Sequence, residues 1–130
     1  MTDKPLILAV DDEEDFLEIA SVYLRSSGFQ AATLATTDSV HLIRRCVELQ
    51  PVLALIDVYD AGEPTGVDLA AALKNDVRTS HIKVILWSSV PCAQETMADD
   101  FFNKSEDLNL LIEKIWRHLP LAAAASSPPS

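Results

Sequence analysis

The chain alternates between short apolar runs and longer stretches in which apolar residues recur every three or four positions. A continuous apolar run of four to eight residues is typical of a strand with both faces buried, as in a parallel sheet. Five such segments predict strands, of which the second is weaker and the fifth is the most polar. They lie at residues 6–10, 30–35, 52–56, 83–87 and 99–103.

The stretches between these strands have the spacing of amphipathic helices. In the first, an i, i+3, i+4, i+7 pattern precedes Gly28, which fits the left-handed residue that ends a helix. We expect Thr37 or Asp38 to cap the second helix and Thr65 to cap the third. The predicted inward-facing residues are Phe16, Ile19, Ala20 and Tyr23, then Val40, Ile43 and Val47, then Val67, Ala70, Ala71 and Leu73, and lastly Leu108, Leu111, Ile112, Ile115 and Leu119.

Strands that alternate with helices imply right-handed βαβ units and a parallel sheet covered on both faces. We therefore predict an α/β fold: a doubly wound, flavodoxin-like sheet of five parallel strands in the order 2-1-3-4-5, with helices on both faces. The segment SVPCAQETMADDFFN, between Ser88 and Lys104, is only fifteen residues long. We expect a shortened fourth helix there, with residues 94–97 as its body, or an irregular segment.

The charge of the chain restricts its partners. Twenty acidic and ten basic residues give a net charge of -10, which disfavours direct binding to nucleic acid or to an anionic membrane. No apolar run reaches the roughly 18 residues of a membrane span, and the N-terminus lacks the pattern of a signal peptide. Two cysteines form neither a disulfide framework nor a zinc motif. We expect a cytoplasmic protein with reduced thiols.

Polar side chains follow four of the predicted strands directly. Asp11 and Asp12 follow the first strand, Asp57 the third, Ser88 the fourth and Lys104 the fifth. In a parallel sheet these positions share one edge, where ligands of such folds bind. Carboxylates that lie close together repel unless one protonates or a cation enters, and an all-oxygen cluster suits Mg²⁺. With an ammonium and a hydroxyl nearby, the set fits in-line phosphoryl transfer to a carboxylate.

Each of these residues also has a plainer interpretation. Asp11 and Asp12 fit the N-terminal cap and acidic first turn of a helix, where the helix dipole favours negative charge. Asp57 alone would be an ordinary residue at the end of a strand, and Lys104 alone an ordinary surface lysine. The phosphoryl-transfer hypothesis therefore depends on the residues meeting at one place.

Four stretches in this order, "ILAVDDEEDFLEIASVYLRSSGF", "LALIDVYD", "VILWSS" and "DDFFNKS", resemble the receiver domain of two-component response regulators. The resemblance covers residues 5–119. It implies that Asp57 accepts a phosphoryl group from a sensor histidine kinase or a histidine phosphotransfer protein. It also implies that Asp11, Asp12, Asp57 and the backbone carbonyl of Tyr59 hold Mg²⁺ or Mn²⁺.

The resemblance assigns three further roles. Ser88 takes the place of the hydroxyl residue that turns toward the phosphate, Lys104 that of the lysine that pairs with it, and Phe101 that of the switch aromatic. Receivers usually have proline after this lysine, whereas this chain has Ser105. The implied function is a single-domain response regulator that changes its binding to an unknown downstream protein, with a receiver domain at 1–120 and a flexible tail at 121–130.

Other function classes fit less well. A receiver that binds partners without phosphorylation stays open as the alternative. A phosphohydrolase of the haloacid-dehalogenase type carries Asp-x-Asp after its first strand, whereas here the sequence is Asp11-Asp12-Glu13. A flavodoxin needs a glycine- and hydroxyl-rich loop there. We therefore expect no enzymatic activity beyond self-phosphorylation and dephosphorylation of Asp57.

Overall fold

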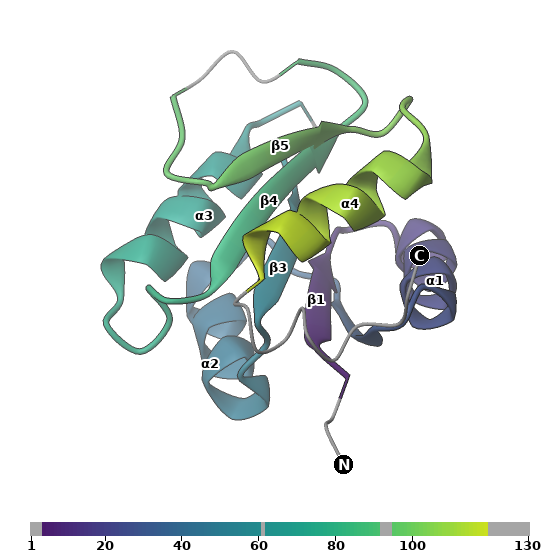
Figure 1. Cartoon of the computed structure of the whole chain (residues 1–130). Coiled ribbons are helices and arrows are strands. Elements are labelled where there is room, and N and C mark those ends of the chain that lie inside the picture. The colour runs from purple at the N-terminus through teal and green to yellow at the C-terminus, as the bar shows by residue number, and fades with distance from the viewer. Residues whose placement is uncertain (1–3, 61, 92–94, 120–130) are drawn as a thin grey trace.

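The computed structural model describes residues 4–60, 62–91 and 95–119. Its five strands form one parallel sheet in the order β2-β1-β3-β4-β5, which confirms the predicted topology (Figure 1). The strands are β1 (Leu6–Val10), β2 (Gln30–Leu34), β3 (Leu53–Asp57), β4 (Lys83–Ser88) and β5 (Asp100–Asn103), and the helices are α1 (Glu14–Ser26), α2 (Ser39–Leu49), α3 (Thr65–Asn75) and α4 (Leu108–His118).

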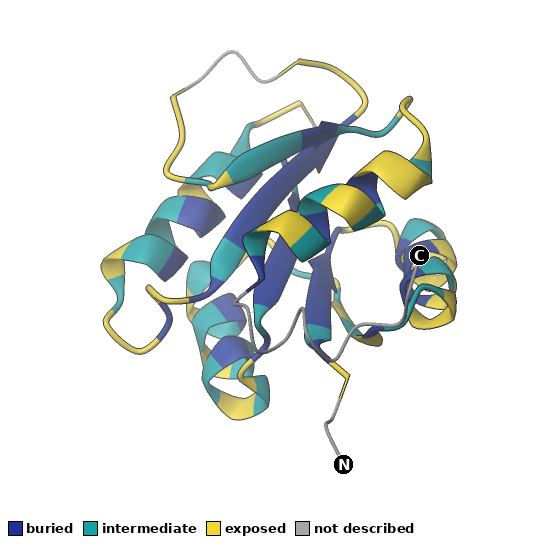
Figure 2. Cartoon of the chain, in the orientation of Figure 1, coloured by how far each residue is buried: buried dark blue, intermediate teal, exposed yellow. Residues whose placement is uncertain are grey.

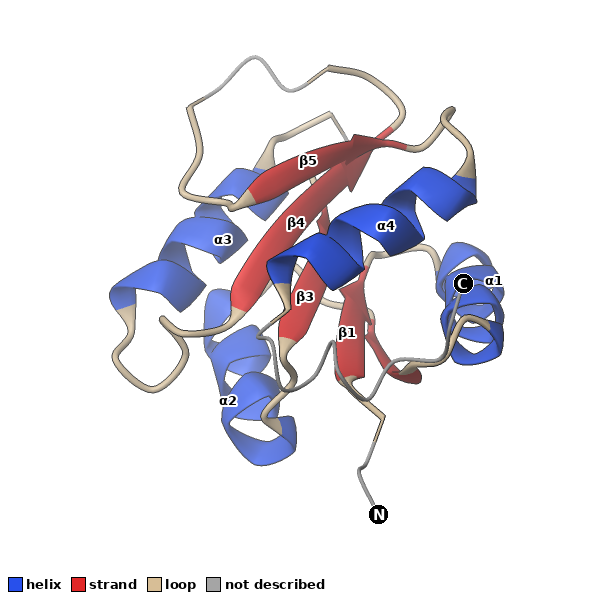
Figure 3. Cartoon of the chain, viewed as in Figure 1, coloured by secondary structure: helices blue, strands red, loops and turns tan. Residues whose placement is uncertain are grey.

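The sheet is buried on both faces, as the apolar runs predict (Figure 2). Helices α1 and α4 cover one face, and α2 and α3 cover the other (Figure 3). Successive strand residues point to opposite faces, so Leu55 packs under α1 and α4 while Ile56 packs under α2 and α3. Both cores hold the central strands rigidly, which fixes the position of the residues that follow them.

The strand register brings the ends of β1, β3 and β4 to one level. Val10 pairs with Ile56 across β1 and β3, and Asp57 pairs with Trp87 across β3 and β4. The residue that follows Val10 therefore stands beside Asp57 at the carboxyl edge of the sheet. This is the edge at which the sequence predicts a site.

The inward faces of α1 and α2 were predicted only in part: Ala20 of α1 is buried, and Phe16 of α1 and Ile43 of α2 pack against the core, as predicted. Ile19 and Val40 are each 62% exposed, whereas Leu17 and Leu24 of α1 and Leu42 of α2 are buried. Each helix carries apolar residues on two adjacent faces, and contact with the twisted sheet selects the neighbouring one. The buried residues of α3 and α4 include Ala70, Leu73, Leu111 and Ile115, as predicted.

Three predictions concern the ends of helices. Asp38 caps α2 by accepting a 3.0 Å hydrogen bond from the backbone N–H of Val40, and Gly28 has a φ of 100° after α1. Both were predicted. The prediction that Thr65 caps α3 is wrong: Pro64 occupies the cap position, and Thr65 is the first helical residue. Proline fits there because it restricts φ and lacks an N–H group that would need a partner.

The connection between β4 and β5 contains no helix in its described residues, 89–91 and 95–99. The predicted short helix at 94–97 is therefore wrong for residues 95–97, and Gln94 lies outside the described residues. A parallel crossover must return the chain along the length of the sheet, and a short connection does so with extended backbone. The alternative prediction of an irregular segment is confirmed for the described residues of this connection.

Side chains of the neighbouring elements anchor this connection at both ends. Lys74 of α3 forms a 2.7 Å ion pair with Asp99, which also accepts a hydrogen bond from the backbone N–H of Val84. At the other end, the hydroxyl of Tyr59 donates a 3.3 Å hydrogen bond to the carbonyl of Pro91. The connection is thus tied to α3 and to the loop after β3.

None of the helices in the described part of the chain is long and apolar enough to cross a membrane. The predicted tail at 121–130 lies outside the described residues. Every peptide bond described is trans, including the bond between Lys104 and Ser105.

Candidate phosphoryl-acceptor site

Three carboxylates meet at the carboxyl edge of the sheet. One oxygen from each of Asp11, Asp12 and Asp57 lies within 4.8 Å of the others. Asp11 is buried, Asp57 is half-buried and Asp12 is exposed. The order β1-β3 in the sheet produces this meeting, because it places the ends of two strands distant in sequence side by side.

The first of these acids also shapes the start of α1. The cap residue of α1 is Glu13, whose side chain makes no cap hydrogen bond. Asp11 Oδ1 instead accepts a 3.1 Å hydrogen bond from the backbone N–H of Glu13. The alternative that Asp11 or Asp12 caps the helix is therefore wrong, although Asp11 does order the turn before it.

Lys104 joins two of the acids. Its Nζ lies 3.0 Å from Asp11 Oδ2 and 3.1 Å from Asp57 Oδ1, as both a hydrogen bond and an ion pair. The backbone N–H of Lys104 donates a 2.8 Å hydrogen bond to the carbonyl of Ser88, which fixes the chain after β5 against the end of β4. The lysine side chain is only 17% exposed. A lysine side chain that is mostly covered therefore stands beside the candidate acceptor.

The pKa of Asp57 is raised to about 6. Burial is the main cause, because it disfavours the charged carboxylate, and the negative charges of Asp11 and Asp12 act in the same direction. The positive charge and hydrogen bond of Lys104 oppose the rise. At neutral pH the carboxyl is mostly ionised, but it is less stable as an anion than an exposed aspartate.

The other predicted site residues lie around this cluster. Ser88 ends β4 and is buried, and its Oγ accepts a 3.2 Å hydrogen bond from the backbone N–H of Val90. Phe101 and Tyr59 are partly buried, and both pack against the core under α2 and α3. Among the described residues the Ser88 hydroxyl makes no hydrogen bond to Asp57. The switch roles of Ser88 and Phe101 and the ligand role of the Tyr59 carbonyl stay predictions.

Two residues near the site were not singled out from the sequence. The ring of Phe16 lies under Lys104, with Nζ 4.1 Å from the ring centroid. Gly66, the second residue of α3, lies so close to Asp57 that a side chain there would collide with the backbone. The sequence alone does not distinguish Gly66 from Gly62, which has open space around it. The helical pattern places Phe16 on the inward face but does not show that it meets Lys104.

The acidic cluster fits a hard divalent cation. Mg²⁺ is usually held by one or two carboxylates, water and a phosphate oxygen, and Asp11, Asp12 and Asp57 offer oxygens at a suitable separation. The raised pKa of Asp57 points the same way, because a cation in the cluster would offset the negative charges that raise it. These three residues would hold the ion.

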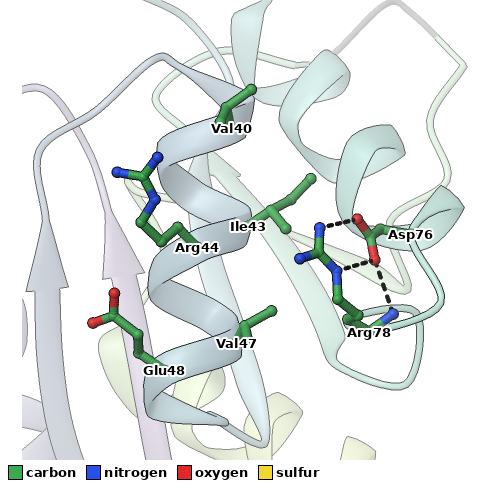
Figure 4. Close-up of a pocket in the computed structure, with 7 residues that line it drawn as sticks. All are labelled: Val40, Ile43, Arg44, Val47, Glu48, Asp76 and Arg78. Atoms are coloured by element: carbon green, nitrogen blue, oxygen red, sulfur yellow. Dashed lines mark hydrogen bonds and ion pairs between the residues drawn. The ribbon is translucent and has the colours of Figure 1, made fainter.

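A second concave surface lies along α2 and shares no residue with this cluster. It has a volume of about 480 Å³ and is flanked by the ion pair of Asp76 with Arg78 (Figure 4). Its other lining residues are Val40, Ile43, Arg44, Val47 and Glu48. Its lining residues include no nucleophile next to a base.

Comparisons with solved structures place this arrangement in a known fold. The chemotaxis protein CheY4 of Vibrio cholerae matches 89% of this chain and 99% of its own, with a TM-score of 0.76 and 16% identity. The response regulator TrrA of Thermotoga maritima, solved in complex with Mg²⁺ and BeF, matches 88% of this chain and 99% of its own, with a TM-score of 0.75 and 22% identity. The chain has the fold of a response regulator receiver domain.

The resemblance to receiver domains is thereby confirmed at the level of the fold. In sequence, the DNA-binding response regulator MtrA of Mycobacterium tuberculosis is 29% identical over 104 residues, which cover 75% of this chain and 43% of MtrA. The chain thus spans less than half the length of the curated relatives it matches. No family model matches it.

Proposed function

We propose that this chain is a receiver that accepts a phosphoryl group on Asp57 from a phosphohistidine and then changes its contacts with other proteins. The observation that carries the proposal is the ion pair between Lys104 and Asp57 inside the three-carboxylate cluster. A buried acid with a raised pKa beside a specific charge partner is typical of functional sites.

Asp57 is the nucleophile in this proposal. Its Oδ attacks the phosphorus, so that a P–O bond forms and the P–N bond to the donor imidazole breaks, and the imidazole leaves with the electron pair of that bond and takes up a proton. The attack requires the ionised carboxylate, and a pKa of about 6 leaves most of it ionised at neutral pH. The ion held by the carboxylates would neutralise charge on the phosphoryl oxygens.

Lys104 is placed so that its ammonium can exchange its contact with a carboxylate for a contact with the phosphoryl group. Its ammonium already lies 3.1 Å from the Asp57 oxygen, so a phosphoryl group on that carboxylate would arrive within its reach. The dianion adds up to about two negative charges at neutral pH. The lysine supplies one positive charge against them, the ion held by the carboxylates would supply the rest, and Ser88 at the end of β4 supplies a hydroxyl.

The donor we propose is a sensor histidine kinase or a histidine phosphotransfer protein. A solved complex of the histidine kinase ThkA with TrrA matches this chain through TrrA, with a TM-score of 0.74 and 22% identity. We assign the receiver to residues 1–120. A single-domain receiver would act by switching its affinity for a downstream protein, not by touching nucleic acid itself.

The test is phosphorylation by a small phosphodonor such as acetyl phosphate with Mg²⁺, followed by intact mass and Phos-tag mobility. We expect one added phosphoryl group on the wild type and none on Asp57→Asn. The matched control is Asp60→Asn, because Asp60 lies three residues further along in the loop and outside the three-carboxylate cluster. It should be modified like the wild type.

Modification of Asp57→Asn at the wild-type level would refute Asp57 as the acceptor. The alternative, a receiver that binds without phosphorylation, predicts no modification of the wild type and unchanged partner binding in Asp57→Asn. Mass addition that requires Mg²⁺ and is reversed by hydroxylamine, which cleaves acyl phosphates, would exclude it.

A further inference from the structure

Lys104 is held between carboxylates on one side and aromatic rings on the other. Its Nζ lies 4.1 Å from the centroid of Phe16 and 5.3 Å from that of Trp87. The same atom lies 3.0 Å from Asp11 Oδ2 and 3.1 Å from Asp57 Oδ1. Ring faces carry negative charge density and attract a cation within about 6 Å. The rings and the acids therefore act on the ammonium together.

The two rings are themselves fixed. Phe16 and Trp87 meet edge to face, with centroids 4.8 Å apart and planes at 60°. Trp87 is fully buried in β4, which is paired on both sides. Phe16 belongs to the first turn of α1, where the backbone N–H of the next residue bonds back to Glu13. The surface under the ammonium is thus built from two elements that the core already holds.

Without the rings of Phe16 and Trp87 beneath it, the Lys104 ammonium could occupy other positions. Its side chain has four flexible bonds and loses much rotamer freedom when it is held in one place. Asp12 belongs to the same cluster and is exposed, so it offers a solvated alternative for the ammonium. Attraction to the ring of Phe16 favours the position between Asp11 and Asp57 over this alternative.

We infer that Phe16, supported by Trp87, is a positioning residue that holds the Lys104 ammonium beside Asp57 before the phosphoryl group arrives. The consequence of this inference rests on the proposed function: a site whose lysine is already in position needs little rearrangement during phosphoryl transfer. In this role Phe16 acts through Lys104. The resemblance to receivers does not supply it.

The test compares side chains at position 16 by their rate of phosphorylation with acetyl phosphate at saturating Mg²⁺. Phe16→Leu keeps apolar bulk and removes the ring, and we expect the rate to fall about threefold to tenfold. Phe16→Tyr keeps a ring face and should restore most of the rate. Mg²⁺ affinity should not fall in either variant, because the three carboxylates are unchanged and an ammonium displaced from them competes less with the ion.

The control variant is Phe29→Leu. Phe29 is a buried aromatic stacked on Trp116 at 4.5 Å, away from the acids. Its loss should lower the melting temperature and leave the phosphorylation rate at the wild-type level. If Phe29→Leu slows phosphorylation as much as Phe16→Leu does, general loosening of the core explains the effect and the positioning role is wrong.

Two measurements keep the inference testable if Phe16→Leu folds poorly. Replacing Phe16 with pentafluorophenylalanine keeps the shape of the ring and reverses the charge on its face, so the rate should fall as in Phe16→Leu. In the protein without metal or donor, NMR of the lysine side chains should show Lys104 protons shifted upfield by the rings. That shift should shrink in Phe16→Leu and persist in Phe16→Tyr.

The outcomes separate this inference from the proposed function. If the wild type is never phosphorylated, the proposed function fails, and the upfield shift alone decides whether Phe16 positions Lys104. If the wild type is phosphorylated and the fluorinated and Phe16→Leu proteins react as fast, the positioning role is wrong while the function stands. A rate that falls equally in Phe16→Tyr and Phe16→Leu also contradicts it.

Discussion

Gly66 lies directly against the backbone of Asp57. A Cβ at position 66 would stand 2.8 Å from the Cα of Val58 and 2.9 Å from the carbonyl carbon of Asp57, and would overlap the carbonyl oxygen of Asp57. The backbone N–H of Gly66 also donates a 2.9 Å hydrogen bond to the carbonyl of Val58. The start of α3 is therefore packed onto the strand end that presents the carboxylate of Asp57, the candidate acceptor.

Substitution of this glycine should disturb both stability and the site. We expect Gly66→Ala to lower the free energy of unfolding by about 2–3 kcal/mol, because rigid backbone atoms must move apart. Gly62→Ala is the matched control: its φ is 83° but nothing lies within 4 Å of its Cβ, so only the left-handed backbone cost of about 1 kcal/mol applies. Urea unfolding measures both, and equal losses would contradict the close-packing argument.

The raised pKa of Asp57 predicts a pH dependence of stability. A carboxyl with a pKa of about 6 in the folded chain and about 4 in the unfolded chain binds its proton more tightly when folded. Its stabilising contribution is fully present below about pH 4 and is lost as the pH rises through about 6. The amide in Asp57→Asn does not ionise, so this variant does not lose stability in that way. Its free energy of unfolding relative to the wild type should rise by about 2 kcal/mol between pH 4 and pH 7.

Chemical unfolding of the two proteins at several pH values measures this difference. Asp60→Asn should show no such trend. Mg²⁺ should reduce the difference at pH 7, because a cation in the cluster stabilises the ionised carboxylate. A difference that is constant across this range would mean that the pKa of Asp57 is close to that of an exposed aspartate.

Lys104 should affect metal binding and phosphoryl transfer in opposite directions. Its ammonium already neutralises Asp11 and Asp57, so it competes electrostatically with a divalent cation. We expect Lys104→Met to tighten Mg²⁺ binding by about tenfold, or about 1.4 kcal/mol, and to slow phosphorylation. Isothermal titration calorimetry measures the affinity.

Lys114→Met is the matched control for that experiment, because Lys114 pairs with Asp100 at 3.1 Å and not with the cluster. It should leave Mg²⁺ binding unchanged. Weaker Mg²⁺ binding in Lys104→Met would show that the lysine supports the arrangement of the carboxylates more than it competes with the ion.

The ion pair of Lys74 with Asp99 should anchor the connection between β4 and β5. Lys74 Nζ lies 2.7 Å from Asp99 Oδ2 and also donates a 2.8 Å hydrogen bond to the carbonyl of Ile82, and the side chains of Lys74 and Asp99 are 13% and 23% exposed. We expect Lys74→Met to cost about 1–3 kcal/mol of stability and to raise amide hydrogen exchange at residues 95–99.

Arg78→Met provides the comparison, because it breaks the Asp76–Arg78 ion pair shown in Figure 4, which lies at the surface. Pairs of that kind contribute little, so stability should scarcely change. Equal effects of Arg78→Met and Lys74→Met on exchange at residues 95–99 would contradict the anchoring role.

The ends of the strands could be predicted closely from the sequence. Continuous apolar runs such as VLALI end where the chain leaves the core, so the residue after each run is at the edge of the sheet whatever the details of packing. Parallel pairing then places those residues together. For this reason the sequence pattern alone predicts that Asp11, Asp57 and Lys104 lie at one place.

The rotation of the helices could not be predicted in the same way. Two sets of apolar residues in α1 have helical spacing: one contains Phe16 and Ile19, and the other contains Leu17 and Leu24. Only packing on the sheet decides how deeply the members of each set are buried. The result exposes Ile19 and turns Phe16 toward Lys104. The pattern does predict that Phe16 faces inward, but it contains no signal for which side chain Phe16 meets there, so the contact with the lysine could not be predicted.

The hydrogen bond from the Tyr59 hydroxyl to the Pro91 carbonyl joins the loops that follow β3 and β4. Such a bond contributes about 0.5–1.5 kcal/mol, so by itself it can shift an equilibrium between two arrangements of these loops by about tenfold at most. To move a two-state equilibrium from 1:99 to 99:1 takes about 5.5 kcal/mol. A complete shift between the two loop arrangements would therefore require several weak contacts of this kind to change together. Tyr59→Phe removes one of them, so it would make the shift less complete without abolishing it.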